Sequence, residues 1–338
     1  MHPLILLPLA ALPSTTYAWG SLGHKTVAFI AQNLIANTTV HWAQDILGNS
    51  NTTYLASIAT WADSYRYTDE GDFTSPFHYI DAEDNPPESC NVDYERDCGE
   101  EGCVVSAIAN YTARVQQSEL GEQEVDYALR FLVHFLGDIT QPLHDEALAL
   151  GGNDIDVTFD GDETNLHSVW DTSIPEELVG GYDLADAEAW AANLTNSIRN
   201  GSFAAQSKSW LKGLDIEDPK ASAMVWARDG NSYVCSTVLP DGTDPLEGED
   251  LYPEYYEGAV DVVKLQIAKG GVRLAAWLDA LAEKAEVGKR ARHWKIGTQG
   301  VRLEQDLSGR QLLPEKRGVK SAAKMRREAV GWGCGHQH

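Results

Sequence analysis

Residues 131–146 read FLVHFLGDITQPLHDE, a run so apolar that a helix here would be buried on most sides. His134 and Asp138 interrupt it, and their spacing of four residues puts them on one face of that helix. Burying an imidazole and a carboxylate costs free energy unless each has a partner. Pro142 then ends or kinks the helix, and His144 follows at once. The pattern fits a hydrogen-bonded pair in the core and fits a metal site equally well.

Most of the other histidines lie in similar settings. The chain has 10 His, of which His2 precedes the main body and three fall in the C-terminal tail. Of the rest, only His41 resembles an ordinary surface residue. Together with three Asp, the others form a candidate ligand set: His24, Asp63, His78, His134, Asp138, His144, His167 and Asp171.

Any one of these histidines alone is more simply explained as a hydrogen-bonded core residue. Five of them with three suitably spaced Asp, in a chain otherwise poor in His, are hard to explain by packing. Imidazole and carboxylate without thiolate favour zinc over manganese or iron, and about eight ligands exceed one tetrahedral site. The sequence therefore predicts a cluster of several metal ions.

Residues 1–18 are predicted to be a secretory signal peptide. Leu4–Leu12 is an apolar core too short to span a bilayer, and Thr16-Tyr17-Ala18 fits the small-residue rule before a cleavage point. No later apolar run is long enough for a transmembrane helix. We therefore expect a secreted, extracellular protein that does not enter a membrane.

The cysteines agree with export. Cys90, Cys98, Cys103 and Cys235 predict two disulfides, for which three connectivities exist, and Cys334 is left over. The GEEG loop between Cys98 and Cys103 favours their pairing, which leaves Cys90 with Cys235. A zinc knuckle is the rival interpretation, although no C-x-x-C spacing occurs. Sequons predict glycosylation at Asn37, Asn51, Asn110, Asn193 and Asn200.

The charge is unevenly distributed. The net charge is −25, but residues 288–338 contain 12 Lys and Arg against 4 Asp and Glu. The remaining body is strongly acidic and would repel a polyanion, which argues against a DNA-binding protein that reads the grooves. If the body acts on phosphates, bound metal ions must supply the positive charge.

The main body is predicted to be one domain, residues 19–287, because it contains no linker, low-complexity stretch or repeat. Amphipathic helical patterns cover 23–35, 40–47, 53–65, 104–117, 125–140, 183–199, 221–234 and, with breaks, 254–281. Val157-Thr158-Phe159 is one of few strand-like runs. The predicted class is mainly α, a single compact helical domain with at most a small β-hairpin. Residues 288–338 are predicted to be a basic, disordered C-terminal extension, with a nucleic-acid-attracting tail and an error of gene prediction as alternatives.

Six short motifs, in this order, resemble those of the zinc-dependent single-strand nucleases of filamentous fungi (S1/P1 nuclease type). They are WG…GH at 19–24, WAD at 61–63, FHYID at 77–81, HxxxD at 134–138, QPLH at 141–144 and HxxxD at 167–171. The resemblance covers Trp19 to about Leu281. It implies a helical fold of the phospholipase C/P1 nuclease type and three zinc ions per chain.

The resemblance also implies how the ligands are shared. One zinc would be held by Asp63, His78, His134 and Asp138, and a second by His144, His167 and Asp171. The third would be held by His24, Asp138, and the freed amino group and carbonyl of Trp19. Asp63 would also orient the attacking water, and Arg66 would stabilise phosphate charge, with a surface salt bridge as the alternative for Arg66.

By the same resemblance, an unpaired base would bind at Tyr79, Asp81, Leu150 and Asn153. Tyr79 stands where the family has a Phe and Leu150 where it has a Val, so base preference stays open. Asp162 stands where some members have an aromatic residue at a second nucleotide site, so the existence of that site here stays open.

These observations favour a secreted, monomeric endonuclease and 3′-nucleotidase acting on single-stranded DNA, RNA and 3′-nucleotides, leaving 5′-phosphates. A zinc-dependent phospholipase C with the same ligand pattern is the alternative enzyme. A secreted zinc-binding glycoprotein without catalytic activity is the alternative from another class. Comparing hydrolysis of single-stranded DNA with that of phosphatidylcholine would separate the two enzymes.

Overall fold

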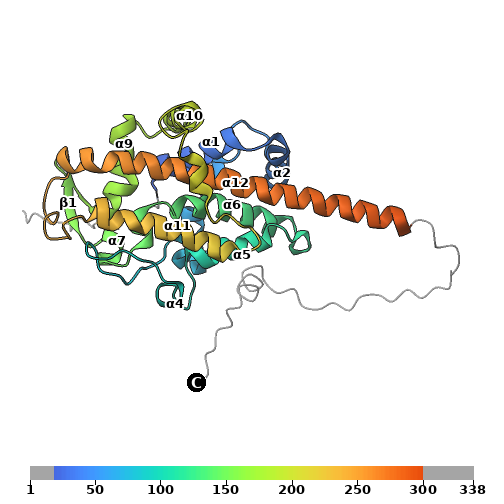
Figure 1. The fold of residues 1–338 in the computed structure, drawn as a ribbon, viewed down its shortest axis with the longest axis horizontal. Helices are drawn as coiled ribbons and strands as arrows, with labels where there is room; N and C mark the ends of the chain where they lie inside the picture. Colours follow the sequence, from blue (N-terminus) through green and yellow to red (C-terminus); the bar gives the residue numbers. More distant parts are fainter. Residues whose placement is uncertain (1–18, 300–338) are drawn as a thin grey trace, which may run out of the picture.

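The computed structural model describes residues 19–299, with side chains described up to Gly288. The predicted signal peptide, Cys334 and residues 300–338 of the predicted extension lie outside the described residues. Within them the chain is mainly α-helical with one two-stranded sheet, which confirms the predicted fold class (Figure 1).

The helices follow one another with short connections. The α-helices are α1 Ser21–Leu34, α2 Asn37–Leu47, α3 Trp61–Tyr65, α4 Tyr94–Asp97, α5 Val104–Arg114, α6 Glu122–Asp138, α7 Ala149–Gly152, α8 Leu166–Ser168, α9 Ile174–Val179, α10 Leu184–Asn200, α11 Pro219–Tyr233 and α12 Glu254–Gln299. Shorter 3-10 or π-helical turns are η1 Ala56–Ile58, η2 Asp72–His78, η3 Ser118–Leu120, η4 Pro142–Asp145, η5 Val169–Ser173, η6 Ser207–Leu211 and η7 Val234–Val238.

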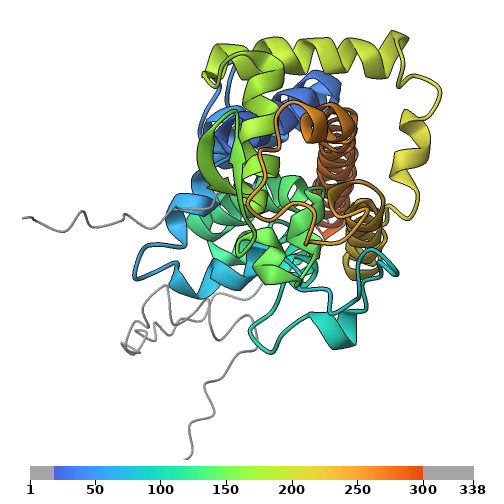
Figure 2. The same cartoon turned by 90° about the vertical axis from the view of Figure 1, so that its left-hand side faces the viewer.

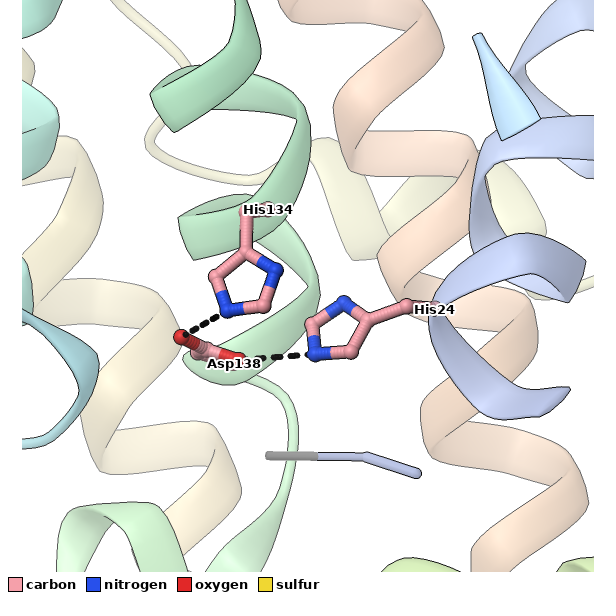
Figure 3. A group of neighbouring side chains, drawn as sticks. All are labelled: His24, His134 and Asp138. Atoms are coloured by element: carbon pink, nitrogen blue, oxygen red, sulfur yellow. Dashed lines mark ion pairs between the residues drawn. The ribbon is translucent and has the colours of Figure 1, made fainter. Parts of the chain in front are cut away.

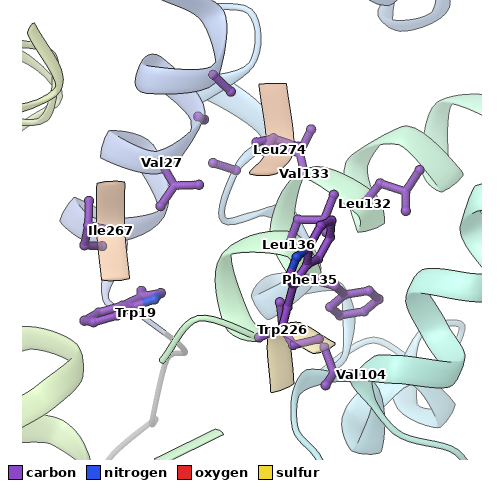
Figure 4. Close-up of a cluster of buried hydrophobic side chains, with 14 of the residues drawn as sticks. Trp19, Val27, Val104, Leu132, Val133, Phe135, Leu136, Trp226, Ile267 and Leu274 are labelled. Carbon is purple, nitrogen blue, oxygen red and sulfur yellow. The ribbon is translucent and has the colours of Figure 1, made fainter. Parts of the chain in front are cut away.

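Helix α6 is the central element, and every residue from Phe131 to Asp138 is buried. Helices α1 and α12 pack on α6 and on each other. Figure 4 shows side chains of α1, α11 and α12 around those of α6. Burying each large apolar side chain contributes roughly 1.5–3 kcal/mol to the stability of the fold. His134 and Asp138 lie on α6 within this apolar core, so the packing around α6 also fixes their positions.

Helix α12 differs from the sequence prediction in two ways. Breaks were expected between residues 254 and 281, but the helix is continuous from Glu254 to Gln299 and extends past the other helices (Figure 1). The glycines that suggest a break serve close packing instead. A Cβ on Gly271 would lie 2.4 Å from Ile30 Cγ2 of α1, so only glycine lets the two helices approach this closely. The helix also covers residues 288–299, which were expected to belong to a disordered extension.

The expected helix over 53–65 is also interrupted. It is replaced by η1 and by α3, with Ala59 and Thr60 between them. The carbonyl of Ala59 does not bond within a helix and accepts a hydrogen bond from His134 Nδ1 at 2.7 Å. The interruption therefore turns a backbone acceptor toward the buried histidine.

The hairpin and the disulfides complete the fold. Strands β1 Asp156–Phe159 and β2 Asp162–Asn165 pair antiparallel, at the end of the molecule away from the projecting α12 (Figure 1). Both predicted disulfides, Cys90–Cys235 and Cys98–Cys103, are present. Figure 2 shows α10 lying across the helical bundle. In residues 19–299 no helix combines the length and the apolar character that a membrane span requires.

Candidate metal centre

Five predicted ligands meet where α1, α3, the end of η2 and α6 come together, and all are at most 1% exposed. Asp138 Oδ1 lies 3.1 Å from His24 Nε2, and its Oδ2 lies 3.1 Å from His78 Nδ1 and 3.2 Å from His134 Nε2. Asp63 Oδ1 lies 3.5 Å from His134 Nε2 and 3.8 Å from His78 Nδ1. Figure 3 shows the rings of His24 of α1 and His134 of α6 next to each other, each with one nitrogen facing an oxygen of Asp138.

The other three predicted ligands form a second group on η4, α8 and η5. His167 Nε2 lies 3.1 Å from Asp171 Oδ2, and His144 Nε2 lies 3.8 Å from Asp171 Oδ1. The rings of His144 and His167 are stacked with centroids 5.0 Å apart. Asp138 acts electrostatically on His144, so the two groups are neighbours in one centre.

Backbone carbonyls orient three of the imidazoles. Each of these histidines donates its Nδ1–H to a carbonyl oxygen: His134 to Ala59 at 2.7 Å, His144 to His78 at 2.8 Å, and His167 to Gly151 at 2.6 Å. This arrangement leaves the Nε2 lone pair of each ring directed into the centre. A hydrogen bond from the far nitrogen to a carbonyl is the usual way in which proteins orient a metal-binding histidine.

Many polar atoms here lack a hydrogen-bond partner although they are buried. They include both carboxylate oxygens of Asp63, Oδ1 of Asp138, Oδ2 of Asp171, and Nε2 of His78 and His144. Native proteins rarely leave such atoms unsatisfied, because each costs about 1–3 kcal/mol. Clustered acceptor atoms in a buried carboxylate–imidazole pocket are what divalent metal ions require, so the residues fit a metal centre.

Burial governs protonation in the centre. Desolvation lowers the pKa of His24 to about 4 and of His78 to about 3, so both imidazoles are neutral and can bind metal at neutral pH. Desolvation also raises the pKa of Asp63 to about 7. For His134 burial acts in the same lowering direction, but Asp138 and Asp63 outweigh it and raise its pKa to about 9. A metal ion would displace that proton.

A third acidic group does not qualify as a metal centre. Asp84, Glu146 and Cys90 lie together, but Cys90 is bonded to Cys235 and offers no thiolate. Asn231 Nδ2 donates to Asp84 Oδ2 at 3.0 Å and to Glu146 Oε2 at 3.3 Å. An amide donor occupies the place that a cation would take.

The family model described as S1/P1 Nuclease matches residues 19–283, which include every predicted ligand. The chain belongs to the S1/P1 nuclease family. This confirms the resemblance on which the ligand assignment rests.

Individual proteins named as nucleases are similar to this chain over most of its length. The chain is 53% identical over 283 residues to Nuclease S1 of Aspergillus oryzae, covering 82% of this chain and 98% of that one. It is 56% identical over 263 residues to Nuclease P1 of Penicillium citrinum, covering 78% and 97%. Endonuclease 4 of Arabidopsis thaliana is 34% identical over 291 residues, covering 82% and 93%. A crystal structure of Clostridium perfringens alpha-toxin aligns with a TM-score of 0.40 at 12% identity, covering 82% of this chain and 66% of that one.

The first residue expected in a mature S1/P1 nuclease, Trp19, is fully buried next to the centre. Its indole Nε1 donates to Thr140 Oγ1 at 3.1 Å, two residues after Asp138. The following amide, of Gly20, donates to the carbonyl of Asp171 at 2.7 Å. The start of the expected mature chain is thus held between the segments that carry two of the ligands.

Two residues predicted to bind the base are next in sequence to residues of the centre: Tyr79 follows His78, and Leu150 precedes Gly151, whose carbonyl accepts from His167. Tyr79 is 38% exposed and Leu150 is 67% exposed. Asn153 Nδ2 donates to the carbonyl of Leu150 at 2.7 Å. Partial burial, with Glu83 and Asp97 nearby, raises the pKa of Asp81 to about 6.

Sequence reasoning missed the groups that hold the ligands in place. Gln141 Nε2 donates to Asp171 Oδ1 at 2.7 Å while its Oε1 accepts from the Leu143 amide at 2.6 Å. Gln141 belongs to the QPLH motif at 141–144, but the sequence alone indicates no role for it. The carbonyls of Ala59 and Gly151 have no signature in the sequence, because any residue supplies a backbone carbonyl.

Proposed function

We propose that this chain is a secreted zinc-dependent endonuclease and 3′-nucleotidase that hydrolyses single-stranded DNA and RNA to 5′-phosphate products. The observation that carries the proposal is the buried set of five His and three Asp with unsatisfied atoms in a member of the S1/P1 nuclease family. The relatives named Nuclease S1 and Nuclease P1 support nucleic acid as the substrate.

We infer three zinc ions per chain. Asp63, His78, His134 and Asp138 would hold one, and His144, His167 and Asp171 a second. His24, Asp138 and the amino and carbonyl groups of Trp19 would hold the third. Zinc bound by these residues would activate water and offset charge on the phosphate and on the leaving 3′ oxygen.

Side chains of the protein would orient the attacking water, stabilise the phosphate and bind the base. Asp63, whose carboxylate oxygens have no hydrogen-bond partner, would orient the attacking water. Arg66 would stabilise the phosphate, since its charge already acts on Asp63 and His78. Tyr79, Asp81, Leu150 and Asn153 would bind the base of the nucleotide whose sugar 3′ oxygen is the leaving group.

The experiment is to measure metal content and hydrolysis on the same preparation of the full chain secreted from a host that processes signal peptides. About three zinc per chain, with 5′-mononucleotides released from single-stranded DNA, is the expected result. Zinc with hydrolysis of phosphatidylcholine instead would favour a phospholipase C, and zinc with neither activity would favour a non-catalytic glycoprotein. Absence of zinc would overturn the metal mechanism.

A further inference from the structure

The side chain of Trp19 is fully buried, although this residue stands at the expected start of the mature chain. The first residues of a domain are usually poorly ordered unless something ties them down. A Cβ placed on Gly23 of α1 would lie 2.9 Å from Trp19 Cβ and 3.2 Å from Ile267 Cδ1 of α12, and Figure 4 shows the Trp19 ring beside Ile267. The ring thus anchors the chain end between α1 and α12.

Thr140, which follows α6, accepts the hydrogen bond of this indole. The indole Nε1–H is the only polar group of the Trp19 side chain, and it donates to Thr140 Oγ1 at 3.1 Å. The Thr140 hydroxyl donates in turn to the carbonyl of Gly137 at 2.7 Å, so its hydrogen is committed and a lone pair faces the indole. The Thr140 carbonyl accepts from Gln266 Nε2 of α12 at 2.7 Å. Thr140 is therefore held by both α6 and α12.

Close backbone approaches leave Thr140 and the ligand His24 little space in which to move. A Cβ on Gly270 of α12 would lie 3.1 Å from Thr140 Oγ1, and a Cβ on Gly137 of α6 would lie 2.9 Å from His24 Nδ1. Gly137 therefore contacts His24 with its Cα and orients the Thr140 hydroxyl with its carbonyl. The same turn of backbone serves a predicted ligand and the residue that holds Trp19.

The main chain next to Trp19 is held as well. The Gly20 amide donates to the carbonyl of Asp171 at 2.7 Å, and the Gly20 carbonyl accepts from the His24 amide at 3.3 Å. The ring on one side and Gly20 on the other restrict the amino and carbonyl groups of Trp19. These groups belong to a chain end, so no helix fixes them as α1 and α6 fix the imidazoles of His24 and His134.

We propose that Thr140 is a positioning residue for the zinc ion that His24, Asp138 and Trp19 would hold. By accepting the indole N–H it fixes the Trp19 ring, and through the ring it fixes the amino and carbonyl groups that would bind zinc. This inference rests on the zinc assignment in the proposed function. Without the hydroxyl, the buried indole N–H would have no acceptor, so the ring would shift and carry both backbone ligands with it.

Thr140→Val tests the proposal, because it replaces the hydroxyl by a methyl group of similar size. Metal analysis of the full secreted chain measures zinc per chain at a series of buffered free zinc concentrations. One site of the variant is expected to need roughly 10- to 100-fold more free zinc than in wild type, as when other groups that orient a metal ligand are lost, while the other two sites do not change. Thr140→Ser keeps the hydroxyl and should bind zinc as wild type does. Excess zinc should restore hydrolysis of single-stranded DNA by Thr140→Val.

A substitution on the donor side shows whether Thr140 acts through the indole. Trp19→Phe keeps an aromatic ring but removes the N–H, so it should weaken the same zinc site by at least the same factor. Adding Thr140→Val to Trp19→Phe should weaken that site no further, because both changes remove one hydrogen bond. The intact mass of each purified protein checks that the mature chain still begins at residue 19.

Thr112→Val is the matched control. Thr112 is also buried, and its Oγ1 accepts from the indole Nε1 of Trp277 at 3.0 Å. The same kind of hydrogen bond is lost there, between α5 and α12, which carry none of the predicted ligands. All zinc sites should therefore keep their affinity in this variant, even though its free energy of unfolding falls.

Each other outcome counts against a different step. Zinc held as tightly by Thr140→Val as by wild type would overturn the role of Thr140 and leave the proposed function standing. Equal weakening in Thr112→Val would mean that general destabilisation explains the effect, and additive losses in the double variant would mean that Thr140 does not act through Trp19. A wild-type protein that binds no zinc would overturn the proposed function itself, and this inference with it.

Discussion

Single residues of the centre have more than one partner each, and Asp138 has the most. Its two oxygens lie within 3.2 Å of three imidazole nitrogens, those of His24, His78 and His134. The three imidazoles outweigh the effect of burial and hold the pKa of Asp138 well below its ordinary value. It stays ionised, which suits the proposed role of Asp138 as a ligand shared between two metal ions.

Asp138→Asn is therefore expected to lose at least one zinc ion and about 100-fold or more of the activity. The amide keeps the shape of the side chain but not its charge. Metal analysis measures the zinc content, and hydrolysis of single-stranded DNA measures the activity. Asp126→Asn is the control, because Asp126 lies on the same helix and pairs only with Arg130, near the surface. Full zinc content and activity in Asp138→Asn would contradict the assignment of the bridging ligand.

Prediction from sequence worked at the scale of residue types. The eight side chains that the structure brings together were all identified from the sequence by their residue type, His or Asp, and two pairs of them also by a spacing of four residues. Residue type is informative here because metal ligation demands particular functional groups. Prediction failed for Ala59, Gly151 and Gln141, because an orienting carbonyl can belong to any residue and an amide fits many roles. The interrupted helix before α3 and the continuous α12 were missed for a related reason: both depend on contacts with distant helices.

At the scale of elements, the short turn α7 is the most constrained segment beside the centre. Four successive residues have positive φ: Ala149 at 51°, Leu150 at 54°, Gly151 at 62° and Gly152 at 79°. Left-handed backbone disfavours side chains with a Cβ, so Ala149 and Leu150 store strain. The turn directs the Gly151 carbonyl at His167 and leaves Leu150 exposed.

Gly151→Ala tests whether this turn positions the ligand. Its new Cβ would lie 2.6 Å from the carbonyl oxygen of Leu143, so the turn must shift and His167 with it. We expect zinc affinity to fall by about 10- to 100-fold, as for loss of other groups that orient ligands. Gly48→Ala is the control, since Gly48 also has positive φ but nothing lies within 4 Å of its Cβ position. If Gly48→Ala weakens zinc binding as much, general strain explains the effect.

Helices α11 and α12 are joined by an ionic contact between two buried cations and Asp229, whose side chain is 29% exposed. Asp229 accepts from Lys269 Nζ at 2.8 Å and from Arg273 Nη2, and both cations are at most 4% exposed. Burial alone would raise the pKa of Asp229, but Arg273 and Lys269 outweigh it and lower that pKa. Its stabilisation is thus fully present above the unfolded pKa of about 3.9 and is lost as pH falls through the lower folded value.

Asp229→Asn is expected to lower the free energy of unfolding by about 3–5 kcal/mol at neutral pH, because two buried cations lose their partner. Below about pH 4 the difference from wild type should shrink. Denaturant unfolding at several pH values measures both effects. Asp261→Asn is the control, because its partner Lys264 lies on the surface of α12. A loss that does not depend on pH down to the acid limit would contradict this account.

For the molecule as a whole, metal binding at the centre is expected to affect the free energy of unfolding as well as the activity. Eight ionisable groups, each at most 7% exposed, lie in the core beside α6, and without cations their unsatisfied atoms cost free energy. Each zinc ion at a thousandfold excess over its Kd adds about 4 kcal/mol.

Chelation should therefore lower Tm by roughly 8–16 °C for each metal ion removed as well as abolish hydrolysis. Differential scanning calorimetry before and after chelation, with zinc content measured alongside, gives the result. Readdition of zinc should restore Tm better than magnesium does, since imidazole ligands favour zinc. An unchanged Tm in protein shown to be free of metal would mean that the buried groups are satisfied without it.

The packing of α12 on α1 and α6 also bears on how the enzyme is made. Every candidate ligand lies between Trp19 and Asp171, yet the helix that packs behind α1 and α6 begins only at Glu254. During synthesis the ligands therefore leave the ribosome well before the helix that encloses them. The pocket can therefore close only after almost the whole described domain has been synthesised, so a chain that stops before α12 carries every candidate ligand but lacks the helix that encloses them.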